Sequence, residues 1–306
     1  MATFFQQLVN GLTLGSIYAL VALGYTMVYG IMELINFAHG DMVMVGALVT
    51  LSLTHVLAGL GVPLALALPL SLLGAMAVCM ALGWLIERVA YRPLRRAPRL
   101  APLITAIGLS MVIEQVAALL WGRGYLTFSL PVSRVWNLGG VVVTPIQTGV
   151  LGLSLLLMWG LLWLVRKTSL GRAMRATAQN PEVARLMGVD TDQVISMTFV
   201  LGSALAAVAG LMVVAYYGIG NYTMGFMLGL KAFTAAVLGG IGSLAGAMWG
   251  GLLLGVVEAL GAGYIGDVTG GLFGSNYKDV FAFLVLIGVL IFHPQGLLGG
   301  RAGEKV

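Results

Sequence analysis

Charged side chains are scarce in this sequence. Asp, Glu, Lys and Arg make up 9% of its 306 residues, whereas 59% of the residues are hydrophobic. Soluble domains carry about 25% charged residues, so the deficit excludes a sizeable soluble domain. The formal net charge of +5 does not indicate nucleic-acid binding, because the basic residues lie in short loops between apolar runs, which is a pattern of membrane topology.

Several chemical motifs are absent as well. The single cysteine, Cys79, lies inside an apolar run, which excludes an intramolecular disulfide and gives no cysteine-based metal cluster. No GxxxxGK followed by Ser or Thr occurs, so the chain has no phosphate-binding loop of its own, and HExxH and CxxC are also missing. We therefore expect no catalytic residues, no metal and no cofactor.

Long apolar runs are abundant. Most are long enough to cross the ~30 Å hydrocarbon core of a bilayer as an α-helix. They predict one all-α transmembrane bundle, without a separate domain over residues 1–306, of about eight or nine membrane segments with discontinuous helices. The expected segments are residues 8–29, 42–60, 63–86, 100–121, 146–165, 194–217, 228–238, 244–261 and 280–292, with loops over 122–145 and 263–278.

Two basic loops orient the expected segments. Residues 86–99 and 166–193 together hold ten of the sixteen Lys and Arg residues, and two apolar runs separate them. An even number of crossings puts both loops on one side, which the positive-inside rule assigns to the cytoplasm. Loop 122–145 then lies outside. Residues 228–242 either cross, which gives nine passes, or re-enter; we favour the crossing.

The most polar stretch is residues 166–193, which holds eight of the 27 charged residues. It also contains local folding signals. Asn180 is a suitable helix N-cap, Pro181 suits the first helical position and Glu182 suits the first turn. Gly188 is suited to end this short helix in the left-handed conformation, and Asp190 to cap the next one.

The short helix predicted after Asn180 is amphipathic. Val183, Leu186 and Met187 lie on roughly one face at helical spacing. An ordered apolar face on a cytoplasmic loop suits a partner protein. The alternative is a solvated loop that only joins two spans.

A second group of polar residues lies near membrane depth. Glu33, Asn36, His39 and Asp41 interrupt the first apolar runs within GIMELINFAHGD. Ionisable groups in such places are costly and point to function. The alternative is an interfacial turn whose polar groups cap two helices.

A glycine-rich break occurs in the other half of the chain, at Gly239, Gly240, Gly242 and Ser243. Paired interruptions in corresponding halves are a signature of a transport pathway. We therefore assign both breaks to a candidate translocation pathway.

Two carboxylates lie inside apolar runs, Glu114 and Glu258. We expect both to face the bundle interior, as packing contacts or as a proton relay, because a lone carboxylate in lipid is costly. Lys231 either reaches the interface or pairs with one of them.

Five sequence blocks resemble a known family. They are LGSIYALVALGYTMVYG at 14–30, INFAHGD at 35–41, IERVAYRPLR at 86–95, FTAAVLGGIGSLAGAMWGG at 233–251 and YKDV at 277–280. Together they resemble the LivH-type permease, a membrane subunit of the bacterial ABC importer for branched-chain amino acids. The blocks run through nearly the whole chain in order.

The resemblance implies an inner-membrane, multi-pass subunit of an importer for Leu, Ile or Val. It implies a second, LivM-like permease subunit, two cytoplasmic ATPase subunits that use ATP, and a periplasmic binding protein. Loop 166–193 resembles the cytoplasmic coupling loop of the family, although it has no Glu-Ala-Ala sequence. The residues that by similarity seat in a groove of an ATPase subunit are Asn180, Pro181, Glu182, Val183, Arg185, Leu186, Met187 and Gly188.

Three alternatives to this function are open. One is a related permease for urea, short amides or other amino acids. Another is a secondary transporter coupled to ions through Glu33, Asp41, Glu114 or Glu258, and a third is a passive channel. The capped loop, together with the missing phosphate-binding loop, favours the ATP-driven permease.

Overall fold

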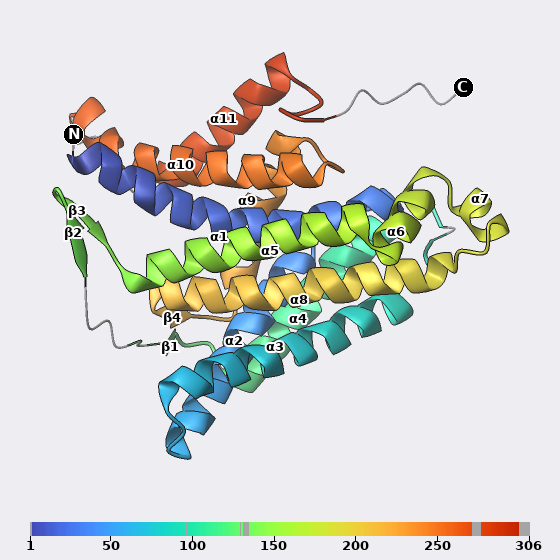
Figure 1. Cartoon of the computed structure of the whole chain (residues 1–306), viewed down its shortest axis with the longest axis horizontal. Helices are drawn as coiled ribbons and strands as arrows, with labels where there is room; N and C mark the ends of the chain where they lie inside the picture. The colour runs from blue at the N-terminus through green and yellow to red at the C-terminus, as the bar shows by residue number, and fades with distance from the viewer. Residues whose placement is uncertain are drawn as a thin grey trace. The chain divides into compact units, whose positions relative to one another are not determined.

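The computed structural model describes residues 2–95, 97–98, 100–128, 130, 135–270 and 277–299. The chain is almost wholly helical (Figure 1). Its helices are α1 (Ala2–Met32), α2 (His39–Gly59), α3 (Leu64–Ile86) with the π-helical turn η1 (Glu87–Tyr91), α4 (Leu100–Trp121), α5 (Pro145–Lys167), α6 (Ser169–Gln179), α7 (Pro181–Leu186), α8 (Thr191–Tyr217), α9 (Met224–Gly239), α10 (Leu244–Val268) and α11 (Lys278–Phe292). The strands are β1 (Leu126–Thr127), β2 (Trp136–Leu138), β3 (Val141–Val143) and β4 (Ile219–Gly220).

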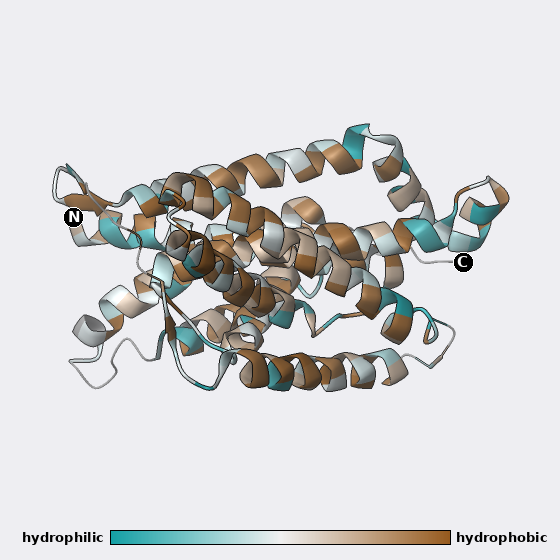
Figure 2. Cartoon of the chain, turned by 90° about the horizontal axis from the view of Figure 1, so that it is seen from below, coloured by the Kyte–Doolittle hydropathy of each residue, from teal (hydrophilic) through white to brown (hydrophobic). Residues whose placement is uncertain are grey.

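Seven helices in the described part of the chain are long and apolar enough to cross a membrane: α1, α2, α3 with η1, α4, α5, α8 and α10. Hydrophobic residues run along these helices, and many hydrophilic residues lie at helix ends and in loops (Figure 2). The polytopic all-α prediction is confirmed. Helix α9 is apolar but has only 16 residues, or about 24 Å at 1.5 Å per residue, so its crossing stays a prediction.

Two boundaries differ from the sequence prediction. Residues 263–268 were expected in a glycine-rich loop, but α10 continues to Val268, because the polar backbone N–H and C=O groups of a segment in lipid are best satisfied by hydrogen bonds within a helix. Residues 271–276 of that expected loop lie outside the described residues. The first break is also shorter than predicted, since α2 begins at His39 and includes Asp41.

The chain divides into two compact units that share helices α1, α5 and α9. One unit contains residues 1–26, 131–159 and 231–306, and the other contains residues 27–130 and 160–230. We refer to them as the terminal unit and the central unit.

In the central unit, α2, α3 and α8 pack against one another. Glycine allows this close approach: a Cβ on Gly46 of α2 would lie 2.5 Å from Cα of Ala207 on α8. Small residues bring membrane helices together in this way, because dispersion forces then act between backbones.

The two basic loops meet at the N-terminal end of α8. Arg92 and Arg95, which follow η1, both contact Asp192 in the first turn of α8. At the other end of α8, β4 pairs antiparallel with β1, with Leu126 opposite Gly220. The 27 residues of α8 separate these ends by about 40 Å. The prediction that both basic loops share one side, opposite the start of loop 122–145, is confirmed.

The terminal unit packs the first part of α1 against α10. A Cβ on Gly255 would lie 2.2 Å from the backbone nitrogen of Gly15, so only glycine fits there. A hairpin of β2 and β3 belongs to the same unit, with Trp136 opposite Val143.

Candidate functional site

The loop between α5 and α8 folds as its sequence predicts. The side chain of Asn180 accepts hydrogen bonds from the backbone nitrogens of Glu182 and Val183, at 3.0 and 3.1 Å. Pro181 occupies the first turn of α7, and Gly188 ends the helix with a φ of +84°. The Asp190 carboxylate then caps α8, accepting from the backbone nitrogens of Asp192 and Gln193 at 3.1 Å.

Helix α7 presents its apolar side chains outward. Val183, Leu186 and Met187 are 53%, 86% and 80% exposed, while Ala184 is buried on the opposite side. Helix α6 lies beside the N-terminal part of α8, and α7 lies beyond that end (Figure 1). A group of large, exposed apolar side chains surrounded by charged residues is typical of a surface that binds another protein.

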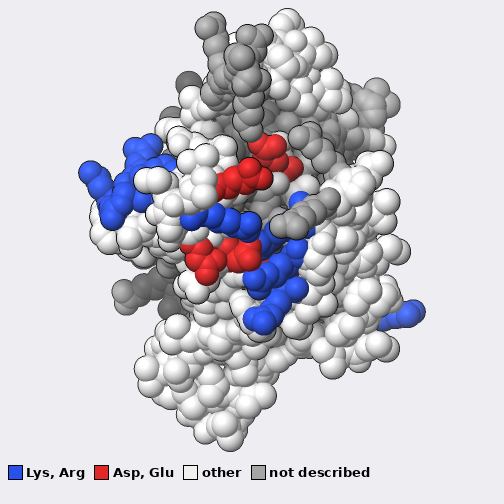
Figure 3. Space-filling model, turned by 90° about the vertical axis from the view of Figure 1, so that its right-hand side faces the viewer, with Lys and Arg blue, Asp and Glu red and all other residues white. Residues whose placement is uncertain are grey.

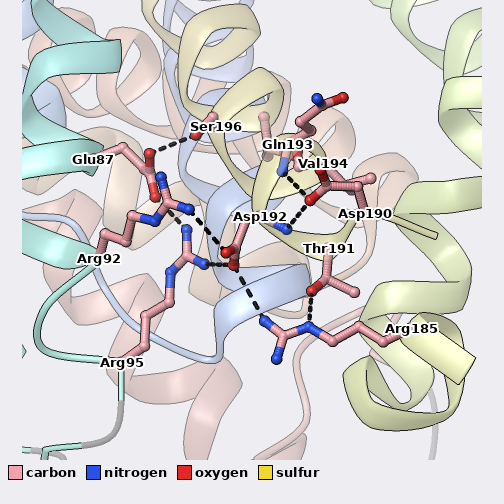
Figure 4. A network of polar contacts seen from close by, with 11 residues as sticks. Glu87, Arg92, Arg95, Arg185, Asp190, Thr191, Asp192, Gln193, Val194 and Ser196 are labelled. Carbon is pink, nitrogen blue, oxygen red and sulfur yellow. Dashed lines mark hydrogen bonds and ion pairs between the residues drawn. The ribbon is translucent and has the colours of Figure 1, made fainter. Parts of the chain in front are cut away.

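Charged side chains gather on the face where α6 and α7 lie, with an uncharged surface around them (Figure 3). The central unit contains an ion-pair network around Asp192 (Figure 4). The Asp192 carboxylate is contacted by Arg92 at 2.9 Å, Arg95 at 2.5 Å and Arg185 at 3.2 Å. The two basic loops and the start of α8 are therefore joined through one carboxylate.

The same network extends inward to Glu87, which is fully buried. Its carboxylate accepts from the hydroxyl of Ser196 at 2.5 Å and is also paired with Arg95. Arg185, the last basic residue of α7, bonds Thr191 at 2.6 Å as well as Asp192. Arg185 thus faces back onto α8, whereas Val183, Leu186 and Met187 face outward.

The first break lies in the central unit, between α1 and α2. Glu33 is exposed and has a positive φ of 52°, a strained conformation for a residue with a Cβ. Asn36 is buried and accepts a hydrogen bond from the Tyr91 hydroxyl at 2.8 Å, and its carbonyl accepts from the backbone nitrogen of His39 at 3.0 Å. Asn36 thus has a clear role in holding the turn.

Asp41 is the most unusual residue of this break. It is 1% exposed, and within the described residues its Oδ2 atom has no hydrogen-bond partner. Its other oxygen, Oδ1, packs against the first turn of α9. The approach is so close that a Cβ added to Gly225 would lie 2.7 Å from this oxygen. A buried carboxylate in a membrane helix is expensive, so this position is a strong functional candidate. His39, beside it, is 2% exposed.

The second break lies in the terminal unit. Gly240 and Gly242 have φ values of +104° and +92°, which only glycine adopts without strain. Ser243 caps α10 by accepting from the backbone nitrogen of Gly246 at 3.1 Å. The carbonyl oxygen of Gly239 accepts from the backbone nitrogen of Leu298 at 2.9 Å. The hydroxyl of Ser243 and the carbonyl of Gly239 therefore both make hydrogen bonds that stabilise the break itself, whether or not the break also lines a pathway.

The terminal unit also contains an ion cluster around the buried Glu258, which joins α1, α9, α10 and α11. Lys231 lies 2.8 Å from Glu258 and 2.7 Å from Asp279, and the Tyr18 hydroxyl donates to Glu258 at 2.9 Å. Lys278 lies 3.6 Å from Glu258. The expectation that Glu258 is interior and paired is confirmed, and Lys231 is its partner. Glu114, by contrast, is half-exposed on α4.

Comparison with known proteins decides the family. Residues 7–290 match the family model described as branched-chain amino acid transport system / permease component. The chain belongs to this family. A permease component carries no ATPase activity of its own, since separate subunits hydrolyse ATP in these transporters. The permease is a multi-pass protein of the inner membrane, in keeping with its seven long apolar helices.

Individual relatives agree with the family model over almost the full length. The permease is 47% identical to the high-affinity branched-chain amino acid transport system permease protein BraD of Pseudomonas aeruginosa, over 99% of this chain and 98% of the relative. It is 44% identical to LivH of Escherichia coli over the same shares of the two chains. A probable LivH of Methanocaldococcus jannaschii is 29% identical over 93% of this chain and 89% of its own.

The permease sequence signalled the capped loop but not the residues that anchor it. Glu87, Arg92, Arg95 and Asp192 form the network, yet none was a site candidate. The available signal was the excess of arginine in residues 86–99. Spacing along the chain gives no indication that Arg95 and Asp192, which are 97 residues apart, are in contact.

Proposed function

We propose that this chain is a membrane-spanning subunit of an ATP-driven importer for branched-chain amino acids, which a periplasmic binding protein delivers. The full-length similarity to BraD and LivH, whose names state this transport, supports the substrate class. Related polar solutes such as urea or short amides have no comparable support. A second, LivM-like permease completes the proposed membrane pathway, and two ATPase subunits drive it.

The observation that carries the coupling role is the exposed apolar face of α7. Val183, Leu186 and Met187 are held outward by caps at Asn180 and Asp190, while Arg185 ties the helix to α8. A groove on an ATPase subunit would bury this face. Movement of α7 would then pass through Asp192 to α8 and through Arg95 to η1.

The test replaces Val183 and Leu186 together with Asp in the assembled importer. Because two buried charges would oppose docking, ATP-driven uptake and substrate-stimulated ATPase activity should both be lost, with the chain still in the membrane. Val135→Asp is the matched control, since Val135 is 52% exposed, as Val183 is, but belongs to the outer loop. Unchanged ATPase stimulation in the double variant would refute the coupling role.

Three substitutions address the pathway role of the breaks. Asp41→Asn and Gly240→Ala change the first and the second break, whereas Glu33→Gln changes an exposed side chain of the first break. We expect uptake to fall in the first two. An ion-coupled transporter is less favoured, because Glu258 is already neutralised by Lys231. Uptake by this chain alone in liposomes under an ion gradient would reverse that ranking.

A further inference from the structure

A cavity of about 480 Å³ lies beside the Asp192 network, where the end of α3 meets the start of α8 in the central unit. Its lining combines charge and apolar surface: Trp84, Arg88, Arg92, Asp190, Asp192, Gln193, Ser196, Met197 and Val200. Asp190 and Asp192 also serve the coupling role proposed above, as a helix cap and as an ion-pair partner, but that role does not use Trp84, Arg88 or Met197. Its two arginines and two aspartates make the lining close to neutral overall.

Two of these charged side chains, Arg88 and Asp190, form no ion pair within the described residues. Within the described residues Arg88 has no carboxylate partner, and its guanidinium lies 5.1 Å from the ring centre of Trp84. Asp190 uses Oδ1 for both capping hydrogen bonds and forms no ion pair in the same part of the chain. Arg92 and Asp192, by contrast, are paired with each other. Among the residues that the structure describes, the cavity therefore offers the Arg88 guanidinium and one carboxylate oxygen of Asp190 to a ligand.

The cavity also lies at the level of a membrane surface. It opens between two helices long enough to cross the bilayer, at the end where both basic loops lie. Trp84 and Met197 are 42% and 49% exposed, which leaves an apolar wall beside the charged groups. Tryptophan is typical of the headgroup level, and arginine extends toward it.

We propose that this cavity binds the headgroup of a zwitterionic phospholipid with a primary ammonium group, of the phosphatidylethanolamine type, from the cytoplasmic leaflet. The phosphate pairs with Arg88, and the ammonium donates hydrogen bonds to Asp190. The start of the acyl chains lies along Trp84, Met197 and Val200. A purely anionic headgroup would leave Asp190 facing like charge, and a choline headgroup has no N–H to donate.

The test measures lipid retention by native mass spectrometry of the full-length chain in its purified assembly. Phosphatidylethanolamine, phosphatidylcholine and phosphatidylglycerol with identical acyl chains are added in equal amounts. We expect phosphatidylethanolamine to be retained severalfold more than either competitor. Arg88→Gln should abolish this excess, whereas Arg88→Lys should keep most of it, because the cation remains.

Asp190→Asn separates charge from folding. Asn caps helices as well as Asp does, so α8 keeps its cap while the negative charge is lost. This variant should bind all three lipids alike. Arg123→Gln is the control, since Arg123 is also exposed but lies beyond the far end of α4. Equal retention of the three lipids by the unmodified protein, or an equal loss in Arg123→Gln and Arg88→Gln, would overturn the proposal, and a preference for phosphatidylglycerol would overturn the ammonium contact.

Discussion

Arg95 joins Asp192 of α8 to the buried carboxylate of Glu87 in η1, so one guanidinium links the two basic loops of the central unit. The two carboxylates differ in surroundings. Within the part of the chain that the structure describes, the Asp192 side chain is 35% exposed and has three arginine partners, whereas Glu87 is fully buried and has one. Removing Arg95 therefore affects Glu87 far more than Asp192.

Arg95→Ala should destabilise the permease strongly. Leaving a buried charge without its partner typically costs about 3–5 kcal/mol. Arg92→Ala is the matched control, because among the described residues Arg92 pairs with Asp192 alone, at a half-exposed site where an ion pair contributes about 0–1 kcal/mol. Thermal unfolding of both variants in detergent measures the difference. Equal melting temperatures for the two variants would show that Glu87 does not depend on Arg95.

Lys231→Met should destabilise the terminal unit, because Glu258 and Asp279 lose their central cation. The expected cost is again about 3–5 kcal/mol for breaking a buried pair from one side. The double variant Lys231→Met, Glu258→Gln should recover part of this loss, since the buried carboxylate is also removed. Folded yield and melting temperature of the single and double variants provide the measurement. A double variant less stable than Lys231→Met alone would contradict the pairing.

Gly46→Val should impair packing of α2 on α8. Even the first carbon of the new side chain would lie 2.5 Å from Cα of Ala207, so the helices must separate. Gly108→Val is the control, because no atom lies within 4 Å of a Cβ built there. We expect a severalfold lower yield of folded protein for the first and little change for the second, measured by size-exclusion chromatography. A normal yield for Gly46→Val would show that α2 and α8 tolerate a wider spacing.

Asp41→Asn tests the first break without changing the size of the side chain. If the buried carboxylate lines the pathway, uptake falls severalfold while membrane expression and melting temperature stay normal. Glu33→Gln is the comparison within the same break, because Glu33 is exposed and its variant separates a role of the buried carboxylate from a role of charge at the break in general. Uptake of labelled leucine into cells measures both. Normal uptake in a well-expressed Asp41→Asn variant would favour a purely structural turn.

Local sequence predicted local structure well. Asn180, Gly188 and Asp190 sit in the capping positions their chemistry favours, because a cap depends on residues two or three positions away. The prediction of a loop at residues 263–268 was wrong, because α10 continues to Val268. Glycine is typical of loops in soluble proteins, but in membrane proteins it also occurs within helices, where it allows close helix packing.

The sequence alone therefore determined the class of the protein, its seven long membrane segments, the shared side of its basic loops and the outward apolar face of α7. These features follow from hydropathy, charge placement and helical period, which are properties of neighbouring residues. Only the tertiary structure decided that Arg95 bridges Glu87 and Asp192, that Lys231 neutralises Glu258, and that Arg88 and Asp190 share a cavity. Those contacts join residues far apart in the chain, and helix packing, which no local pattern encodes, brings them together.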